Sequence, residues 1–377
     1  MKILLLESFY TSSHKQWADG LIKHSSHEIH LITLPGRHWK WRMHHAGKYF
    51  AFEITELKST FDLILCSDLM NIAEFRGVLS ALGNHDSWFN EIPVVTYFHE
   101  NQITYPWSES DPDIDLKRDN HYGWINYISC ISSDHIMFNS KFHKSSFINA
   151  LPYFLKQFPA VSQNNGIDSI ENKSTVLPIG LSLDELSKST RSKNKKPVIL
   201  WNHRWEYDKN PELFFKTLIE LKSKNYDFDL IIAGEKYKKY PKIFDEAKSE
   251  LEDQIIHFGF ARDSKEYKEL LLKSDILPVT SKQDFFGISA IEAIAAGCVP
   301  ILPNRLAFPE HLNEAVFQEY YYDSCDELTA KILHFLDTKP DSSQSLRDYI
   351  LKYDLGIVAP KYDHCFEQVI SIFRNDP

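Results

Sequence analysis

The sequence has few of the residues that build disulfide or zinc frameworks. Its 377 residues include five cysteines, and no two of them form a Cys-x-x-Cys pair. An odd number without regular spacing argues against a disulfide scaffold and favours reduced thiols, as in the cytoplasm. The 17 histidines contain no His-x-x-x-His pair on a convincing helix, and His44 and His45 are expected in a basic loop. We therefore expect a cytoplasmic protein without a metal site.

Long hydrophobic runs are also missing. No apolar run approaches the roughly 20 residues that span a bilayer, so no membrane insertion is expected. Residues 1–7 hold a short apolar stretch before Glu7, which suits a buried strand better than a signal peptide. Basic residues are outnumbered, 42 against 52 acidic ones, and the net charge of −10 disfavours extensive nucleic-acid binding. Apolar and charged fractions of 43% and 25% indicate a globular protein.

Short apolar runs alternate with amphipathic stretches along the chain. This spacing predicts βα units and parallel sheets, hence an α/β fold of two Rossmann-like domains facing a ligand cleft. Residues 187–196 are rich in Lys and Ser, which is typical of a linker. The expected organisation is an N-terminal acceptor domain 1–186, a linker 187–197 and a C-terminal donor domain 198–355. The strands are expected at 2–6, 28–34, 61–66, 92–98, 135–139, 175–179, 198–201, 230–233, 255–258, 276–279 and 299–302.

Two carboxylates, Asp284 and Glu292, stand eight positions apart between a predicted strand and a helix that Gly297 closes. Eight residues make a little over two helical turns, so the pair can contact both ends of an extended ligand such as a nucleotide-sugar. A simpler alternative has Asp284 as a helix N-cap and Glu292 as a solvated residue.

Two cations, Arg204 and Lys209, follow the predicted strand 198–201, and Pro211 then opens a helix over 211–222. A guanidinium fork and an ammonium group just beyond a strand end suit a diphosphate. Ordinary surface ion pairs remain the alternative for either residue alone.

These residues carry a family resemblance. Arg204 and Lys209, followed by Asp284 and Glu292, resemble the donor site of retaining glycosyltransferases with the GT-B fold. Five further blocks together resemble the tRNA-queuosine α-mannosyltransferase family, over nearly the whole chain. The blocks are Glu7-Ser-Phe-Tyr-Thr-Ser-Ser-His-Lys-Gln16, Leu34-Pro-Gly-Arg-His-Trp-Lys-Trp-Arg42, Phe98-His-Glu-Asn-Gln102, Trp201-Asn-His-Arg-Trp205 and Asp284-Phe-Phe-Gly287.

The resemblance implies a mechanism and its residues. The donor would be GDP-mannose, used as a substrate with no cofactor, and the acceptor queuosine in tRNA; no oligomeric state is implied. His99 would hydrogen-bond the transferred sugar, Asp284 would grip its hydroxyls, and Arg204 and Lys209 would hold the leaving diphosphate. A C-terminal helix over about 356–377 would return to the first domain. The donor-binding set would be Ser12, Ser13, His14, Arg204, Lys209, Asp284, Phe286, Gly287 and Glu292, although many GT-B relatives have glycines where this chain has Thr11, Ser12 and Ser13.

Residues 36–52 contain four Lys or Arg residues, three histidines, five aromatic residues and no acid. Cations interleaved with exposed aromatics suit phosphate contacts and base stacking, so this segment is the expected tRNA surface. The alternative is that the aromatics pack at a domain edge while the cations are solvated. The acceptor-binding candidates are Arg37, Trp39, Lys40, Trp41, Arg42, Glu100 and Asn101.

Two other functions compete with tRNA mannosylation. The same fold and chemistry would serve a lipid or glycan acceptor, which a basic amphipathic helix would favour; Gly47 is expected to interrupt one in 36–52. A non-catalytic nucleotide-sugar or RNA-binding protein is the second alternative. It is disfavoured because His99, Arg204, Lys209, Asp284 and Glu292 are all present.

Overall fold

The computed structural model describes residues 1–83, 87–108, 111–116, 118–159, 166–191, 194–338 and 344–375. The chain forms two compact units. Unit 1 comprises Met1–Leu181 and Leu355–Pro377, and unit 2 comprises Ser182–Asp354. Positions 192–193 of the expected linker and 376–377 of the expected final helix lie outside the described residues. None of the helices in the described ranges has the length and apolar character needed to cross a membrane.

Unit 1 is built on a parallel six-stranded sheet in the order β2-β1-β3-β4-β5-β6. Its central strands are buried apolar runs, because helices cover both faces of a parallel sheet. The strands are β1 Lys2–Tyr10, β2 Glu28–Pro35, β3 Leu63–Ser67, β4 Val94–Phe98, β5 His135–Phe138 and β6 Ser174–Val176. The helices are α1 Ser12–His24, α2 Trp39–Thr55, α3 Ile72–Leu82, α4 Pro112–Asp115, α5 Asn120–Ser132, α6 Lys141–Leu155, α7 Ile167–Asn172 and α15 Leu355–Asn375, with a short 3₁₀ turn at Trp88–Asn90.

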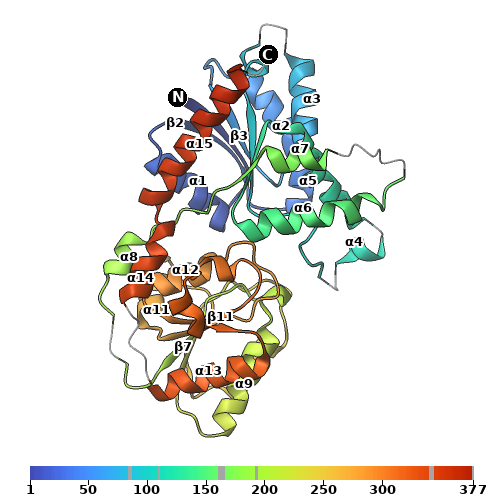
Figure 1. Cartoon of the computed structure of the whole chain (residues 1–377). Coiled ribbons are helices and arrows are strands. Elements are labelled where there is room, and N and C mark those ends of the chain that lie inside the picture. The colour runs from blue at the N-terminus through green and yellow to red at the C-terminus, as the bar shows by residue number, and fades with distance from the viewer. Residues whose placement is uncertain are drawn as a thin grey trace. The chain divides into compact units, whose positions relative to one another are not determined.

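Helix α15 joins unit 1 although it is the last element of the chain. It lies beside α1 (Figure 1), where the Trp17 indole N–H donates to the Tyr362 hydroxyl at 3.2 Å. The Asp363 carboxylate accepts from the backbone N–H of Ser26 at 2.7 Å. These bonds tie the C-terminal helix to the first βα unit.

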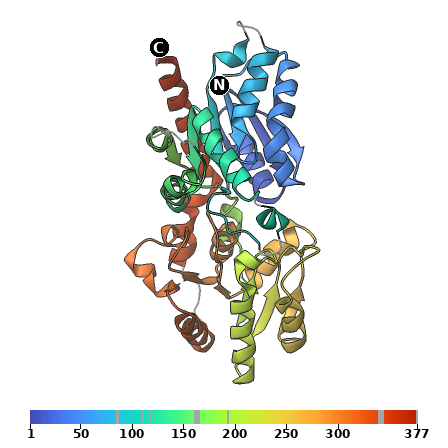
Figure 2. The same cartoon turned by 90° about the vertical axis from the view of Figure 1, so that its right-hand side faces the viewer.

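Helix α2 is continuous from Trp39 to Thr55, so the expectation that Gly47 interrupts it was wrong. His44 and His45 accordingly lie on this helix and not in a loop. A Cβ atom at Gly47 would lie 2.7 Å from the Asn71 carbonyl oxygen, because α2 and α3 lie side by side there (Figure 2). Gly47 therefore permits close helix packing instead of breaking the helix.

Unit 2 contains a second parallel six-stranded sheet, in the order β12-β11-β10-β7-β8-β9. Its strands are β7 Val198–Trp201, β8 Asp229–Ile232, β9 Ile255–Phe258, β10 Ile276–Pro278, β11 Val299–Pro303 and β12 Tyr321–Tyr322. Its helices are α8 Asp184–Lys188, α9 Pro211–Ser223, α10 Ile243–Glu250, α11 Ser264–Lys273, α12 Ile288–Ala295, α13 Cys325–Thr338 and α14 Gln344–Ile350. Short 3₁₀ turns occur at Tyr207–Lys209, Phe308–Glu310, Ala315–Tyr320 and Leu351–Tyr353.

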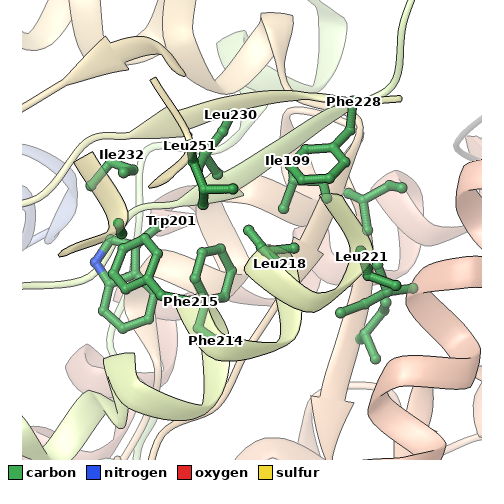
Figure 3. Close-up of a cluster of buried hydrophobic side chains, with 14 of the residues drawn as sticks. Ile199, Trp201, Phe214, Phe215, Leu218, Leu221, Phe228, Leu230, Ile232 and Leu251 are labelled. Atoms are coloured by element: carbon green, nitrogen blue, oxygen red, sulfur yellow. The ribbon is translucent and has the colours of Figure 1, made fainter. Parts of the chain in front are cut away.

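The core of unit 2 is aromatic beneath the end of β7. Trp201 contacts Phe214 and Phe215 of α9 and Phe244 of α10, with ring centroids 4.9 to 5.7 Å apart. Figure 3 shows Trp201, Phe214 and Phe215 together at one end of this cluster. This packing fixes the strand end from which the next residues enter the candidate site.

The predicted α/β class with two Rossmann-like halves is confirmed. The change of unit, however, lies at Leu181/Ser182 and not after residue 186. Backbone N–H groups of Leu183 and Asp184 donate to Asp354 Oδ2 at 3.0 and 2.9 Å, which joins the two ends of unit 2. Arg191, expected in the linker, donates to Asp275 at 2.8 Å and is held on unit 2.

Candidate active site

The strand order of unit 2 reverses between β7 and β10. From β7 the chain proceeds to β8 and β9 on one side, and then returns to place β10 on the other. Ligands of open α/β sheets bind at such switch points, beyond the carboxyl ends of the strands. The residues that follow β7 include Arg204 and Lys209, and those that follow β10 include Asp284, so the predicted donor residues share this edge.

Lys209 and Asp284 are bonded directly to each other. The buried Lys209 ammonium donates to Asp284 Oδ1 at 2.9 Å and to the Gln283 carbonyl at 2.9 Å, and lies 3.1 Å from Asp208 Oδ2. Burial acts to lower the pKa of Lys209, but the Asp284 and Asp208 carboxylates outweigh it and raise the pKa. Lys209 is thus a buried cation held between two carboxylates.

Asp284 keeps one oxygen for another partner. Its Oδ2 is buried, and none of the described residues bonds to it. Helix α12 is capped by Gly287 and not by Asp284, so the alternative of Asp284 as an N-cap is wrong. Gly287 has φ of 80°, a left-handed conformation that side chains other than hydrogen adopt with strain. Asp284 therefore lies in the turn between β10 and α12, at the carboxyl edge of the sheet, and α12 begins after it.

Arg204 is more accessible than Lys209. Its side chain is 44% exposed and pairs with Glu206 at 3.1 Å and, more loosely, with Asp208 at 3.8 Å. Because Asp208 faces both Arg204 and Lys209, the two cations are coupled through one fully buried carboxylate. The positive charge of Arg204 and Lys209, expected to hold a diphosphate, is therefore partly balanced by carboxylates of the protein.

Glu292, two turns into α12, belongs to a polar cluster. The Tyr267 hydroxyl of α11 donates to Glu292 Oε2 at 3.0 Å and accepts from the Asn202 amide at 3.2 Å. Asn202 also donates to the Ser289 carbonyl at 2.8 Å. Ser289 Oγ lies 2.8 Å from His203 Nδ1, and burial lowers the pKa of His203 to about 4, so this imidazole is neutral. These bonds orient the strand-end residues 202 and 203 against α12.

Phe286 and Phe308 line the turn before α12. Phe286 is buried against His311 and Tyr353, with ring centroids 5.4 and 5.2 Å apart. The His311 imidazole bonds to the Phe286 carbonyl oxygen. The packing of Phe286 on His311 and Tyr353 thus stabilises the turn.

In unit 1 the strand order changes between β1 and β3, and their ends are joined by buried polar groups. Glu7 of β1 accepts from Ser67 Oγ at 3.0 Å and from the Phe9 N–H at 2.8 Å, and lies 3.2 Å from His14 Nδ1. Burial acts to lower the pKa of His14, but Glu7, with smaller effects of Asp68 and Glu100, raises it to about 9. His14 is therefore an imidazolium at neutral pH, held by the buried Glu7.

His99, at the end of β4, lies directly against His14. Their ring centroids are 4.0 Å apart, and the edges of Trp17 and Tyr97 enclose His99 at 4.9 Å. Both His99 ring nitrogens are buried, and no described residue bonds to them. Burial, together with His14, holds the pKa of His99 well below its ordinary value. A neutral imidazole without protein partners suits a ligand hydroxyl.

Asp68 positions the loop that carries His99. Its carboxylate accepts from the backbone N–H groups of His99 at 3.2 Å and Glu100 at 3.3 Å. Burial raises the pKa of Asp68 to about 7. Asn139, after β5, donates to the His99 carbonyl at 2.8 Å and completes the support.

The turn between β1 and α1 holds Ser12 and Ser13, the other predicted donor contacts. Ser12 is exposed with φ of 45°, and the N-cap Thr11 makes no side-chain capping bond. The first N–H groups of α1 are therefore not capped by that side chain. Close by, Glu7, His14 and His99 each offer one possible metal-ligand atom, all within 4.8 Å of one another.

The predicted acceptor segment divides into packed and exposed residues. Lys40 donates to both Asp111 oxygens, at 2.7 and 2.9 Å, and to Asp113, and lies over the ring of Trp107. Trp39 packs in the same cluster, 5.1 Å from Tyr122. Both residues thus make contacts within unit 1, which matches the packing alternative for Trp39, whereas Lys40 is paired with aspartates and not solvated as that alternative expected.

Trp41, Arg37 and Arg42 face outward. Trp41 is 70% exposed and Arg37 is also exposed, while Arg42 is half-buried and donates to the Pro35 carbonyl at 3.1 Å. For these three residues, contact with tRNA stays a prediction.

Glu100 and Asn101, the other two acceptor-binding candidates, also differ in burial and in hydrogen bonding. Glu100 is half-buried and accepts from the Gln102 amide at 2.8 Å. Asn101 is buried, and its side-chain oxygen accepts from the N–H groups of Ile103 and Thr104 at 3.0 and 2.9 Å. The Asn101 side chain thus forms the turn and leaves contact with an acceptor to Glu100.

Several site residues were not predicted from the sequence. Glu7 follows the predicted strand 2–6 and Asp68 follows β3, so a polar residue after a predicted buried strand was the signal. Asp208, Asn202 and Tyr267 acquire their roles only through contacts that no local pattern contains.

Comparison with known proteins agrees with this geometry. A family described as "tRNA-queuosine alpha-mannosyltransferase N-terminal" matches residues 2–181, and one described as "Glycosyl transferases group 1" matches 183–353. A tRNA-queuosine alpha-mannosyltransferase of Drosophila melanogaster is 31% identical over 385 residues, covering 98% of this chain and 97% of that protein. The chain belongs to the tRNA-queuosine α-mannosyltransferase family.

More distant relatives agree on the fold. A GDP-mannose:cellobiosyl-diphosphopolyprenol alpha-mannosyltransferase of Xanthomonas oryzae is 25% identical over 190 residues, 47% of this chain and 48% of that protein. A glycosyltransferase structure from Rickettsia africae has a TM-score of 0.65 at 15% identity, with 98% of each chain covered. Anabaena HepE in complex with UDP has a TM-score of 0.63 at 13% identity, covering 99% of this chain and 100% of that one. These structures share the GT-B fold expected from the sequence.

Proposed function

We propose that this member of the family transfers mannose from GDP-mannose to queuosine in tRNA, with retention of anomeric configuration. The observation that carries the proposal is the convergence of Lys209, Asp284 and Glu292 at the switch point of unit 2 in a chain 31% identical, end to end, to a tRNA-queuosine alpha-mannosyltransferase. Unit 2 is assigned the donor and unit 1 the acceptor.

In the proposed reaction the bond between the anomeric carbon and the diphosphate oxygen breaks first. Arg204 and Lys209 stabilise the charge that develops on the leaving group, an electrostatic effect that is large in a site shielded from water. The unpartnered Oδ2 of Asp284 accepts from sugar hydroxyls, and Glu292 accepts from the ribose. The acceptor hydroxyl bonds to the anomeric carbon on the same face and gives its proton to the departing phosphate oxygen.

In this proposal His99 of unit 1 hydrogen-bonds the transferred sugar. Its neutral ring can donate from one nitrogen and accept at the other, and both are buried without protein partners among the described residues. No cofactor or metal ion is required, since Arg204 and Lys209 supply the charge. We place the enzyme in the cytoplasm with its tRNA, where the five free cysteines would stay reduced.

The test is a donor and acceptor panel. The chain is incubated with GDP-mannose, GDP-glucose, UDP-glucose or UDP-galactose and with tRNA that contains or lacks queuosine, and nucleosides are analysed by mass spectrometry. We expect one added hexose on queuosine, only with GDP-mannose and only in queuosine-containing tRNA. Donor hydrolysis without any transfer to tRNA would overturn the acceptor assignment.

One observation favours testing a lipid acceptor in the same panel. Helix α2 is continuous, and its exposed positions include Trp41, Lys48, Tyr49 and Phe52, an aromatic and basic face that also suits a membrane interface. Transfer of hexose to a polyprenyl-phosphate acceptor in vesicles, with none to tRNA, would establish the alternative.

A further inference from the structure

Unit 1 contains a pocket outside the cluster of Glu7, His14 and His99. Its volume is about 430 Å³, within the roughly 300–1,000 Å³ of typical ligand pockets. It lies between α2, the start of α3 and α5. The lining residues are His44, Asn71, His121, Trp124, Ile125 and Phe158.

One wall of the pocket is aromatic. The rings of Trp124 and Phe158 have centroids 4.9 Å apart and planes inclined by 47°, which forms a corner against which a flat ring can stack. Trp124 remains 37% exposed although it is among the largest apolar side chains. Exposed aromatic faces at a concave site are typical of positions that bind unstacked bases.

The other polar lining residues supply hydrogen-bonding groups. Burial, with a smaller effect of His121, lowers the pKa of His44. A neutral imidazole can donate and accept, as the edge of a nucleobase requires. The Asn71 side-chain oxygen accepts from the Glu74 N–H at 3.1 Å, which leaves its amide N–H₂ as a donor.

The lining favours a neutral flat ligand over a phosphate or a lipid tail. Neither lysine nor arginine occurs among the six lining residues, so a phosphate would find no cation there. Three of the six are polar, which disfavours an acyl chain. A nucleobase combines a face for stacking with an edge of donors and acceptors.

Helix α5 connects the pocket to the loop that carries His99. Asn126, next to Ile125 on α5, accepts from the Gln102 N–H at 2.7 Å through its side-chain oxygen. Gln102 in turn donates to Glu100, the residue after His99. Asn71 follows β3 by four positions, three after Asp68. A base in the pocket would therefore lie on the same edge as His99 and Glu100.

We propose that this pocket binds a nucleobase of the acceptor RNA, stacked on Trp124 and Phe158 and bonded at its edge by His44, His121 and Asn71. The identity of the RNA rests on the proposed function. The base is either the modified base that receives the sugar or a neighbouring base of the same strand, since both present the same chemistry.

Binding of RNA without donor tests the pocket directly. The full chain is titrated into a fluorescently labelled anticodon stem–loop RNA that contains queuosine. Loss of one stacking contact in Trp124→Ala should weaken affinity by about 5- to 150-fold, and Trp124→Phe should recover most of it. Tyr153→Ala, which removes an exposed aromatic side chain on α6 outside the pocket, is the matched control and should leave affinity unchanged.

A second variant guards against a loss of binding that results only from misfolding of Trp124→Ala. His121→Ala changes an exposed lining residue, and it should weaken RNA binding while the melting temperature stays near that of the wild type. Wild-type RNA affinity in folded Trp124→Ala and His121→Ala proteins would overturn the proposal. Weaker binding in both supports it.

A comparison of two acceptor substrates shows whether the pocket binds the modified base or a neighbouring base. If the pocket holds the modified base, Trp124→Ala should raise the KM for free queuosine nucleoside and for the stem–loop alike. If it holds a neighbour, only the stem–loop KM should rise. The proposed function is tested separately: it is wrong if the wild type binds the RNA but transfers no mannose to it. In that case the binding titrations with the Trp124 variants still show whether the pocket binds a base.

Discussion

Lys209 Nζ lies 2.9 Å from Asp284 Oδ1, so the residue expected to hold phosphate and the residue expected to hold sugar are bonded to each other. The bond joins the segment that follows β7 to the segment that follows β10, across the switch point. Before donor binds, Lys209 is neutralised by Asp284 and Asp208. A diphosphate must therefore compete with two carboxylates, and it gains most from Lys209 when its own charge grows in the transition state.

Arg204 and Lys209 should accordingly respond differently to removal. Arg204→Ala should lower kcat about 100- to 1,000-fold, about 2.7–4 kcal/mol of barrier, and should change the melting temperature less than Lys209→Ala, because its side chain is 44% exposed. Lys209→Ala should lower kcat similarly and also destabilise the fold by about 3–5 kcal/mol, because buried Asp208 loses a partner. Turnover and thermal melting measure both effects. Wild-type turnover in folded Arg204→Ala would show that Arg204 does not stabilise the leaving diphosphate.

Glu292 should govern nucleotide affinity. Glu292→Gln keeps the shape of the side chain but weakens acceptance from two hydroxyls, so GDP affinity should fall by about 1.5–3 kcal/mol. Tyr267→Phe removes only the hydroxyl that donates to Glu292 Oε2 and should have a smaller effect. Calorimetric titration with GDP compares the two. Equal GDP affinity in wild type and Glu292→Gln would reduce Glu292 to a structural role.

Much of the fold follows from local patterns in the sequence. Buried parallel strands are runs of apolar residues, so each predicted run coincides with a strand to within a few residues. The two-residue strand Tyr321–Tyr322 was missed because so short a segment has no period. Helix α2 was misjudged because the intrinsic cost of glycine in a helix is overridden at Gly47 by close packing on α3.

The site is less local than the fold. Polar residues at strand ends, such as His99 and Arg204, could be predicted because parallel strands end at one edge. The pairing of Glu7 with Ser67, 60 positions away, could not, since it depends on the order of strands in the sheet. Lys40 was assigned to the surface for the same reason, because its partners Asp111 and Asp113 are distant in sequence.

The Glu7–His14 pair should make stability depend on pH. The pKa of His14 is about 9 in the folded chain and near 6.5 when unfolded, so the native state binds the extra proton between these values. Its contribution is complete below about pH 6.5 and is lost as the pH rises through 9. Melting temperatures measured from pH 6 to 9.5 should therefore decline.

Glu7→Gln should flatten this decline by removing the charge that raises the pKa of His14. Glu28→Gln, at an exposed position of β2, is the control and should retain the wild-type slope. An unchanged slope in Glu7→Gln would show that another group titrates.

Removal of metal ions should leave transfer intact. Because Arg204 and Lys209 supply the positive charge at the diphosphate, dialysis against EDTA should not change the rate of mannose transfer. Added Mg²⁺ or Zn²⁺ should not raise it. A rate that falls with EDTA and returns with one ion would instead direct attention to Glu7, His14 and His99, whose ligand atoms lie within 4.8 Å of one another.

The acceptor segment offers the sharpest contrast between neighbouring residues. Arg37 and Arg42 lie at the surface, whereas Lys40 is held by Asp111 and Asp113. Arg37→Ala and Arg42→Ala together should weaken tRNA binding and lower its salt slope by about one unit for each lost phosphate contact. Lys40→Ala should leave that slope unchanged and lower the melting temperature, because it removes a partly buried ion pair.

The adjacent tryptophans extend the same contrast. Trp41→Ala removes a side chain that is 70% exposed, so it should weaken tRNA binding by about 1–3 kcal/mol with little loss of stability. Trp39→Ala opens the cluster with Trp107 and Tyr122 and should lower the melting temperature. Hydrolysis of GDP-mannose without tRNA should be unaffected in Trp41→Ala, since Trp41 is not among the candidate donor-binding residues. If the Arg37/Arg42 and Trp41 variants modify queuosine-containing tRNA at the wild-type rate and affinity, this segment is not the RNA surface.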